Sequence, residues 1–180
     1  MKNSIISASV RNILEGFNID PKDEDLKDTP ERVENAMREM LSGYDVDDKQ
    51  FYKLFKATDH DMVIVKDIGF NSLCKHHLLP FSGTVSIGYI PNKYIIGLSK
   101  FSRIVDCFSK RLQLQENLTR EILKSIEKHL KPLGAIVLMK ASHNCMSCRG
   151  VKQSDAVTVT LAKSGEFEKN DILNCFFNML

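Results

Sequence analysis

The spacing of hydrophobic residues changes repeatedly along the chain, and each change indicates a different secondary structure. Near the N-terminus, hydrophobic residues recur every three or four positions, which predicts amphipathic helices over 6–17 and 29–41. From residue 62 the period shortens to two, which predicts two paired strands over 62–68 and 85–89 and a further strand over 94–98. The chain is therefore expected to pass from a helical segment into a sheet.

Helical spacing returns in the middle of the chain and then gives way to strands again. Two long helices are predicted over 99–112 and 118–130, two strands over 135–141 and 156–161, and a short terminal helix over 171–179. Because helices and strands come in blocks and do not alternate strictly, we expect an α+β domain with helices on one face of a largely antiparallel sheet.

Composition and charge narrow the function classes. The 180 residues are 43% hydrophobic and 27% charged, which suits a soluble domain with a core. The 25 basic and 23 acidic residues leave a net charge of only +2, without the basic excess of a nucleic-acid binder. No stretch approaches the ~18 apolar residues of a membrane helix, and residues 1–17 do not resemble a secretory signal. We expect a cytoplasmic protein with no nucleic-acid or membrane partner.

Cysteine and histidine gather in two short segments that are far apart in the chain. The segments are Cys74-Lys75-His76-His77 and His143-Asn144-Cys145-Met146-Ser147-Cys148-Arg149-Gly150. Thiolate and imidazole are the ligands that zinc prefers, and the odd total of five cysteines argues against a disulfide framework. Because residues 78–144 separate the two segments, the fold must assemble any metal site that they form.

Two forms of zinc site remain open from spacing alone. Cys74, His77, Cys145 and Cys148 could form a closed site that only stabilises the domain, or three ligands could leave a position for water, as catalysis requires. Extra groups beside these ligands favour the catalytic form, since imidazoles can shuttle protons and a structural site needs no added charge. These groups are His76, His143 and Arg149.

Two polar segments between the cysteine-containing segments can bind parts of a ligand. Ser99, Lys100 and Arg103 lie at a strand-to-helix junction, where a helix N-terminus and two cations can hold an anion. Glu116 lies where the two long helices meet, and a carboxylate can accept from the N–H groups of a purine edge. Each segment also has an ordinary explanation, as a capping serine with solvated charges or as a polar break between helices.

Taken together, these segments resemble the GTP cyclohydrolase I family. The resemblance spans roughly residues 5–165 in order and rests on six segments, which are 28–32, Cys74-Lys75-His76-His77-Leu78-Leu79-Pro80-Phe81, Gly88-Tyr89-Ile90-Pro91, Gly97-Leu98-Ser99-Lys100, 111–119 and 143–151. It implies a tunnelling fold, a four-stranded antiparallel sheet with two long antiparallel helices. It also implies a single domain over 1–180, with an N-terminal helical segment over 1–50 and a catalytic core over 60–165.

The resemblance also implies an activity and an assembly. Members of the family convert GTP and water to 7,8-dihydroneopterin triphosphate and formate, the first step toward tetrahydrofolate or other pterins. They form homodecamers of two pentamers, with active sites at subunit interfaces. For this chain we therefore expect GTP as substrate, zinc as cofactor and a second copy of the chain as partner.

Site residues carry over from the family by position. Zinc would be held by Cys74, His77 and Cys145, which leaves Cys148 as a non-ligand and the fourth position for a water that adds to C8 of guanine. The remaining roles are proton transfer by His143 with support from His76, action near the ribose by Ser99, recognition of guanine by Gln115 and Glu116, and binding of the triphosphate by Lys100, Arg103 and Arg149.

One position departs from the family pattern. Lys75 stands where the family usually has glutamate, which changes the local charge beside the metal by two units. In an extended segment its side chain would point away from Cys74 and His76, so it would tune the site and not build it. Two alternatives follow: a tunnelling-fold enzyme that acts on another purine or pterin, and a non-catalytic zinc-stabilised module.

Overall fold

The structure is a computed structural model that describes residues 4–180 and divides into two compact units. The first unit ends at Ser42 and contains two helices, α1 (Ile5–Gly16) and α2 (Thr29–Met40), as the hydrophobic spacing predicts. Within this unit, Ser7 donates to Glu31 with an O···O distance of 3.1 Å, and Arg11 forms an ion pair with the same carboxylate. These contacts hold α1 against α2.

The second unit, Gly43–Leu180, is built on a five-stranded sheet in the order β5-β2-β3-β6-β7. Its strands are β2 (Val63–Cys74), β3 (Pro80–Ile90), β5 (Leu112–Gln113), β6 (Gly134–His143) and β7 (Thr158–Gly165). The four long strands pair antiparallel, whereas the two-residue β5 runs parallel to the end of β2. The predicted mixed α+β architecture is confirmed, with one short parallel strand added at the edge.

The strand predicted over 94–98 does not join this sheet. It is β4 (Tyr94–Ile96), which pairs antiparallel with β1 (Leu54–Lys56) in a separate two-stranded sheet. Two 3₁₀ helices precede β1, namely η1 (Ser42–Asp45) and η2 (Asp48–Phe51). The turn at 91–93 therefore directs the chain out of the main sheet and does not form a simple hairpin within it.

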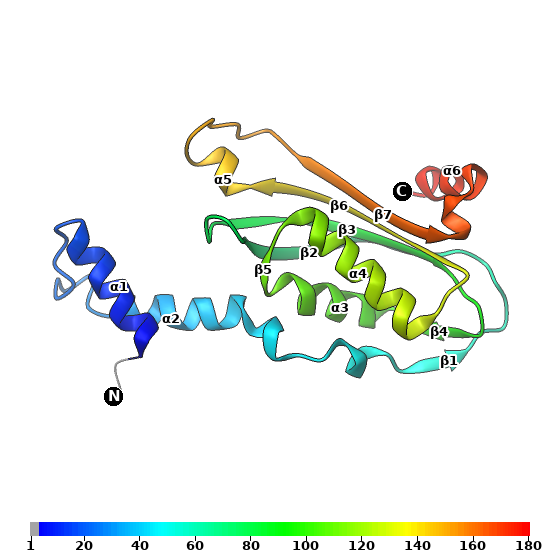
Figure 1. Cartoon of the computed structure of the whole chain (residues 1–180), viewed down its shortest axis with the longest axis horizontal. Coiled ribbons are helices and arrows are strands. Elements are labelled where there is room, and N and C mark those ends of the chain that lie inside the picture. The colour runs from blue at the N-terminus through cyan, green and yellow to red at the C-terminus, as the bar shows by residue number, and fades with distance from the viewer. Residues whose placement is uncertain (1–3) are drawn as a thin grey trace. The chain divides into compact units, whose positions relative to one another are not determined.

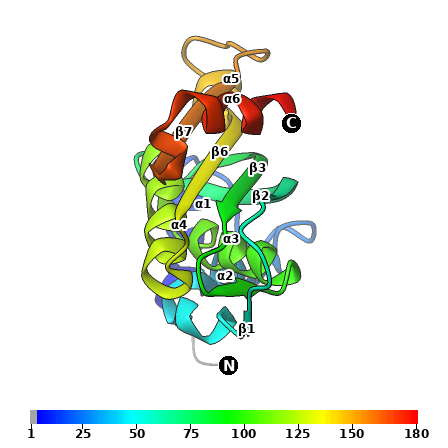
Figure 2. The same ribbon diagram turned by 90° about the vertical axis from the view of Figure 1, so that its right-hand side faces the viewer.

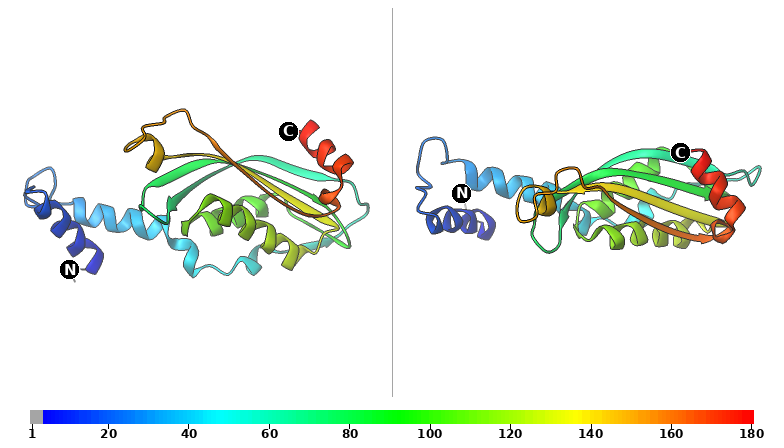
Figure 3. Two further views of the ribbon diagram at one scale, coloured as in Figure 1. Left: turned by 45° about the horizontal axis from the view of Figure 1, so that its top comes forward. Right: turned by 90° about the horizontal axis from the view of Figure 1, so that it is seen from above.

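Two helices cover one face of the main sheet, α3 (Ser99–Ser109) and α4 (Gln115–Leu130), as Figures 1 and 3 show. Alternate residues of β6, such as Val137 and Met139, join the hydrophobic core formed with these helices and are 0% exposed. Burial of this face stabilises the unit because apolar surface is removed from water on both the strands and the helices.

The opposite face carries the C-terminal elements η3 (Glu166–Glu168) and α6 (Asn170–Asn178). Figure 2 shows α6 close to β6 and β7. Phe176 of α6 and Phe167 form a second hydrophobic cluster with Ile136 and Leu138, the β6 residues that alternate with those of the first core. Within residues 4–180, none of the helices is both long enough and apolar enough to cross a membrane.

The register of the sheet brings the end of β2, the start of β3 and the end of β6 to the same end of the sheet. β2 ends at Cys74, and Leu73 pairs with Pro80 at the start of β3. The next residue of β3, Phe81, pairs with His143 at the end of β6. The short helix α5 (Asn144–Ser147) follows at once, so both cysteine-containing segments meet at this end of the sheet.

Candidate active site

A tight turn after β2 brings Cys74 and His77 together. The carbonyl of Cys74 accepts hydrogen bonds from the backbone N–H groups of His77 and Leu78. The backbone N–H of Cys74 donates to the carbonyl of Leu79, with an N···O distance of 2.8 Å. Leu78 adopts φ 55°, in the left-handed region, which lets the chain reverse into β3. Because residues 75–77 form this turn, Lys75 is not in the extended segment considered from the sequence.

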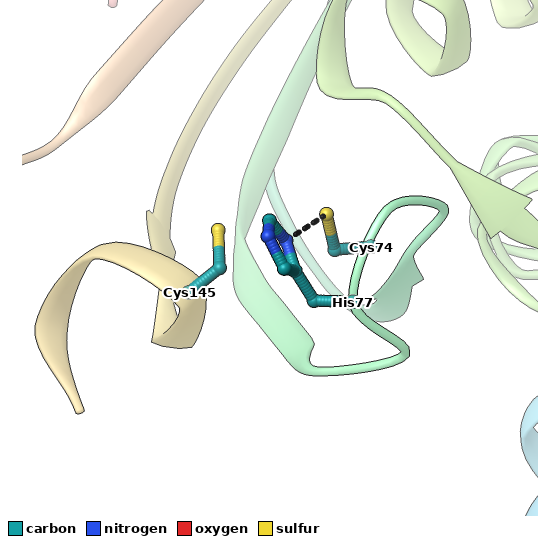
Figure 4. A group of neighbouring side chains, drawn as sticks. All are labelled: Cys74, His77 and Cys145. Carbon is teal, nitrogen blue, oxygen red and sulfur yellow. Dashed lines mark hydrogen bonds between the residues drawn. The ribbon is translucent and has the colours of Figure 1, made fainter. Parts of the chain in front are cut away.

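Cys145, in the first turn of α5, completes a group of three possible metal ligands. The ligand atoms of Cys74, His77 and Cys145 lie within 4.8 Å of one another (Figure 4). The distance from Cys74 Sγ to His77 Nδ1 is 3.7 Å. Tetrahedral zinc, with bonds of about 2.3 Å to sulfur and 2.0 Å to nitrogen, separates such a pair by about 3.6 Å. The donor set and its spacing therefore fit a zinc ion.

Cys148 lies outside this group among the residues that the structure describes. Its side chain is exposed, and its thiol donates to the carbonyl of Asn144 at 2.7 Å. The pKa of Cys145 is raised by burial and by the neighbouring Cys74 thiol, while Arg149 acts in the opposite direction. The structure therefore groups three possible ligands, with Cys148 apart from them and Arg149 nearby.

His143 lies beside the metal-ligand group with its ring held on two sides. The ring stacks on Phe81 with centroids 4.6 Å apart and planes at 3°. Its Nε2 lies 2.7 Å from Oε1 of Gln115. Burial lowers the pKa of His143, and the Glu116 carboxylate opposes this shift by electrostatic attraction. The neutral ring is therefore favoured, in a fixed orientation.

The neighbouring residues Gln115 and Glu116, which the sequence groups together, have different environments. Gln115 is only 1% exposed, and its side-chain amide bonds to other parts of the protein. Glu116 is exposed at the start of α4 and close enough to His143 to affect its pKa. Of these two residues, Glu116 is the one whose side chain presents its polar atoms to solvent.

His76 and Lys75, in the turn between Cys74 and His77, are exposed. The ring of His76 contacts that of His77 edge to face, with centroids 6.1 Å apart. Lys75 lines a polar cavity of about 200 Å³ together with Arg111 and Glu121, and its backbone N–H donates to the carbonyl of Gln113. Because β5 pairs with Cys74 through Gln113, this cavity lies directly beside the metal-ligand turn.

The predicted triphosphate-binding residues lie on separate elements of the structure. Arg149 lies near Cys145, whereas Ser99, Lys100 and Arg103 occupy the first turns of α3. The last residue of α3 leads to β5 and the metal-ligand turn, and the helix rise places the first residue about 15 Å from the last along the axis. Ser99 is also the first residue of the helix and not its cap, because Leu98 occupies the N-cap position without a side-chain bond.

Sequence reasoning missed the groups that support His143. These are Phe81, which stacks on its ring, and Thr119 and Thr160, which share a hydrogen bond of 2.7 Å beneath Gln115. Phe81 lies a few residues after the paired histidines and is followed by the polar Ser82. An apolar residue next to a polar one in a strand indicates which face is buried, but it does not show which side chain lies opposite.

Sequence comparison gives a consistent set of relatives. A family model described as GTP cyclohydrolase I matches residues 6–180. GTP cyclohydrolase 1 of Porphyromonas gingivalis is 46% identical over 163 residues, which cover 89% of this chain and 84% of that protein. The protein of the same name from Dictyostelium discoideum is 42% identical over 178 residues, with coverage of 97% and 77%. That from Caldanaerobacter subterraneus is 47% identical, with coverage of 90% and 87%.

A solved structure is similar at a lower level. The archaeosine synthase QueF-Like in its apo form gives a TM-score of 0.46 at 23% identity, over 58% of this chain and 93% of that chain. This likeness carries no argument about the site.

Proposed function

Because this chain belongs to the GTP cyclohydrolase I family, we propose that it converts GTP and water to 7,8-dihydroneopterin triphosphate and formate. The observation that carries the proposal is the group of Cys74, His77 and Cys145 at the same sheet end as His143. A metal-ligand group beside a partly buried imidazole is the combination needed for hydrolysis of a carbon–nitrogen bond with proton transfer.

Zinc is the metal that we propose, held by Cys74, His77 and Cys145. Two thiolates and one imidazole form a donor set that zinc prefers over harder cations such as magnesium. When bound, zinc would supply Lewis acidity, which lowers the pKa of water toward neutrality. The turn at 75–79 and helix α5 would hold the ligands in place before the metal arrives.

His143 is proposed to accept a proton from the water that adds to the purine and to deliver it to the imidazole nitrogen as the ring opens. Its position on β6, its stacking on Phe81 and its partial burial support this role, since a fixed imidazole transfers protons more efficiently than a mobile one. His76, exposed beside His77, is proposed as a supporting proton carrier. Ser99 is proposed to act near the ribose during the later rearrangement.

Substrate recognition is proposed to divide between the base and the phosphates. The exposed carboxylate of Glu116 can accept from the N1–H and the 2-amino group of guanine, which distinguishes guanine from bases that lack those donors. Lys100, Arg103 and Arg149 are proposed to bind the triphosphate, because a nearly neutral protein needs a local cluster of cations for such an anion. The family resemblance assigns Gln115 to the guanine as well.

The active assembly is proposed to be a homo-oligomer, a decamer of two pentamers, with the tunnelling fold in each subunit. The distance along α3 between Ser99 and the metal-ligand turn supports a site completed by a second copy of the chain. Strand β7 also leaves one edge unpaired within the chain and exposes Val157, Val159 and Leu161 near it. An unpaired apolar edge is a ready surface for strand pairing between subunits.

The whole of residues 1–180 is proposed to act as one GTP cyclohydrolase I-like domain, with a helical segment over 1–50 and a catalytic core over 60–165. The match of the family model to residues 6–180 supports this extent. The product would enter tetrahydrofolate or other pterin biosynthesis as its first committed intermediate.

Formate release from GTP by the zinc-loaded protein tests the proposal. We expect stoichiometric formate and 7,8-dihydroneopterin triphosphate, identified by mass, and a strongly reduced rate from the His143→Ala variant. Release of formate or an equivalent fragment only from another purine would favour the related enzyme. Tight zinc binding without turnover of any purine nucleotide would favour the non-catalytic module.

A further inference from the structure

The orientation of the Gln115 side chain is fixed by its hydrogen-bond partners. Its Nε2 lies 3.0 Å from the carbonyl oxygen of Thr158, 3.3 Å from that of Met139 and 3.1 Å from Oγ1 of Thr160. Two of these partners are carbonyl oxygens, which can only accept, so the NH₂ end of the amide must face them. The oxygen end, Oε1, therefore faces Nε2 of His143.

This orientation determines which nitrogen of His143 carries hydrogen. Oε1 of Gln115 can only accept, and its distance of 2.7 Å from Nε2 is that of a hydrogen bond. Nε2 must therefore be the donor. Within residues 4–180, the hydrogen bond described for the His143 ring is made by Nε2. The other ring nitrogen, Nδ1, is therefore left to exchange a proton with a ligand.

We propose that Gln115 is a positioning residue that holds His143 with hydrogen on Nε2, so that Nδ1 is the atom that transfers the proton. The inference rests on the proposed function, in which His143 acts in proton transfer. It assigns the Gln115 side chain to orientation of the catalytic imidazole, whereas the family resemblance assigns it to recognition of guanine.

The surroundings of Gln115 suit orientation better than recognition of a base. The residue is 1% exposed, and both ends of its amide are already bonded within the protein. A second layer supports it, because Thr119 donates to the carbonyl of Gln115 at 2.8 Å and also bonds to Thr160. To read guanine, the side chain would have to give up its hydrogen bonds to β6 and β7 as well as the bond to His143.

Nitrogen-15 NMR of the unmodified, zinc-loaded protein with labelled histidine tests the assignment directly. We expect the His143 signal, identified by its loss in His143→Ala, to show hydrogen on Nε2 and none on Nδ1 at a pH where the ring is neutral. Hydrogen on Nδ1 with a bare Nε2 would overturn the proposal. This measurement needs no turnover, so it remains decisive if the protein releases no formate from GTP and the proposed function fails.

Kinetics of a Gln115→Met variant separate the two roles of this residue. Loss of the acceptor should lower kcat by about 10-fold to 100-fold, the usual cost of removing a group that orients a functional side chain. KM for GTP should change by less than about threefold, and the preference for GTP over inosine triphosphate, which lacks the 2-amino group, should persist. A raised KM and a lost preference with unchanged kcat would instead assign Gln115 to the base.

Gln113→Met is the matched control, since Gln113 is a buried glutamine two residues away whose amide bonds to Phe108 and Glu121 and not to His143. It should keep the His143 spectrum of the parent protein. Gln115→Glu keeps an oxygen acceptor for Nε2 and should recover part of the kcat lost in Gln115→Met. If the Gln115 variants do not fold, the spectrum of the unmodified protein still decides the proposal.

Discussion

The ring of His143 lies flat against the ring of Phe81, with centroids 4.6 Å apart and planes at 3°. The two residues are paired across β3 and β6, so the register of the sheet creates the stack. Phe81 is 1% exposed and cannot move without disturbing the core. One ring face of His143 and one ring edge are thus fixed, while its other groups remain available to a ligand.

Replacement of His143 tests whether it transfers protons or binds metal. His143→Ala should retain zinc and GTP binding but lower formation of dihydroneopterin triphosphate by about 10²-fold to 10⁴-fold, the usual contribution of a general acid. Metal analysis, GTP binding and product formation check the three parts separately. Turnover close to that of the parent protein would remove His143 from the mechanism.

Paired cysteine variants test the open metal site. Cys145→Ser should lose bound zinc, because it removes a thiolate from a group of three ligands. Cys148→Ser should retain it, since this exposed thiol bonds to the carbonyl of Asn144. Zinc content after dialysis against a weak chelator provides the measurement. Equal loss in both variants would indicate a closed site with four ligands.

Glu116 is expected to recognise the base without supporting the fold. Glu116→Ala should weaken GTP binding by about 10-fold to 100-fold, because guanine donors would lose a charged acceptor. The free energy of unfolding should change by less than about 0.5 kcal/mol, since the residue is exposed. Glu127→Ala, at another exposed glutamate of α4, is the control and should leave GTP affinity unchanged.

Lys75 is expected to set the pH dependence of the reaction without holding the metal. A cation lowers the pKa of groups near it, so Lys75→Glu should shift the acidic limb of the rate profile to higher pH, by roughly half a unit at low salt. The shift should shrink as salt is added, and zinc content should stay constant. Lys128→Glu, at an exposed position near the far end of α4, should shift the profile much less.

A contrary result at Lys75 would change the functional assignment. If the zinc-loaded parent protein releases no formate from GTP and Lys75→Glu does, Lys75 marks a different activity.

Two adjacent phenylalanines test the packing of α6 on the sheet. Phe176 is 0% exposed and contacts the cluster around Ile136, so Phe176→Ala should lower stability by about 3–5 kcal/mol. Phe177 is 46% exposed, and Phe177→Ala should cost much less. Denaturant unfolding at equal protein concentration measures both. Similar losses would show that α6 is held in another way.

The long elements could be predicted from the sequence because their periodicity is sustained. α3 and α4 carry a hydrophobic stripe over several turns, and β6 begins with an unbroken apolar run over residues 135–139 that is buried on both faces. β5 could not be predicted, because Leu112 and Gln113 are too few to show a period. The extension of β2 from 68 to Cys74 was also missed, since Asn71 and Ser72 interrupt the run of branched residues.

The ligand group could be anticipated from residue chemistry, whereas the surroundings of His143 could not. Cys74, His77 and Cys145 are identifiable because few other roles combine thiols and imidazole at that spacing. The burial of Gln115 depends on carbonyl groups of Met139 and Thr158, which lie on two strands distant in sequence. Such bonds arise from tertiary packing, and no local pattern encodes them.

The proposed metal ligands come from two separate parts of the sheet, because Cys74 ends β2, Cys145 follows the end of β6, and β3 separates these two strands. During synthesis, a chain that has reached residue 144 carries Cys74 and His77 but still lacks Cys145. Two ligands hold zinc weakly, so a partly made chain would not retain the ion. Tight binding requires β6 to have paired with β3, and the ion then closes a loop that includes residues 78–144. If zinc binds as proposed, its retention reports completed sheet assembly, and loss of the ion should first loosen the sheet end that holds His143.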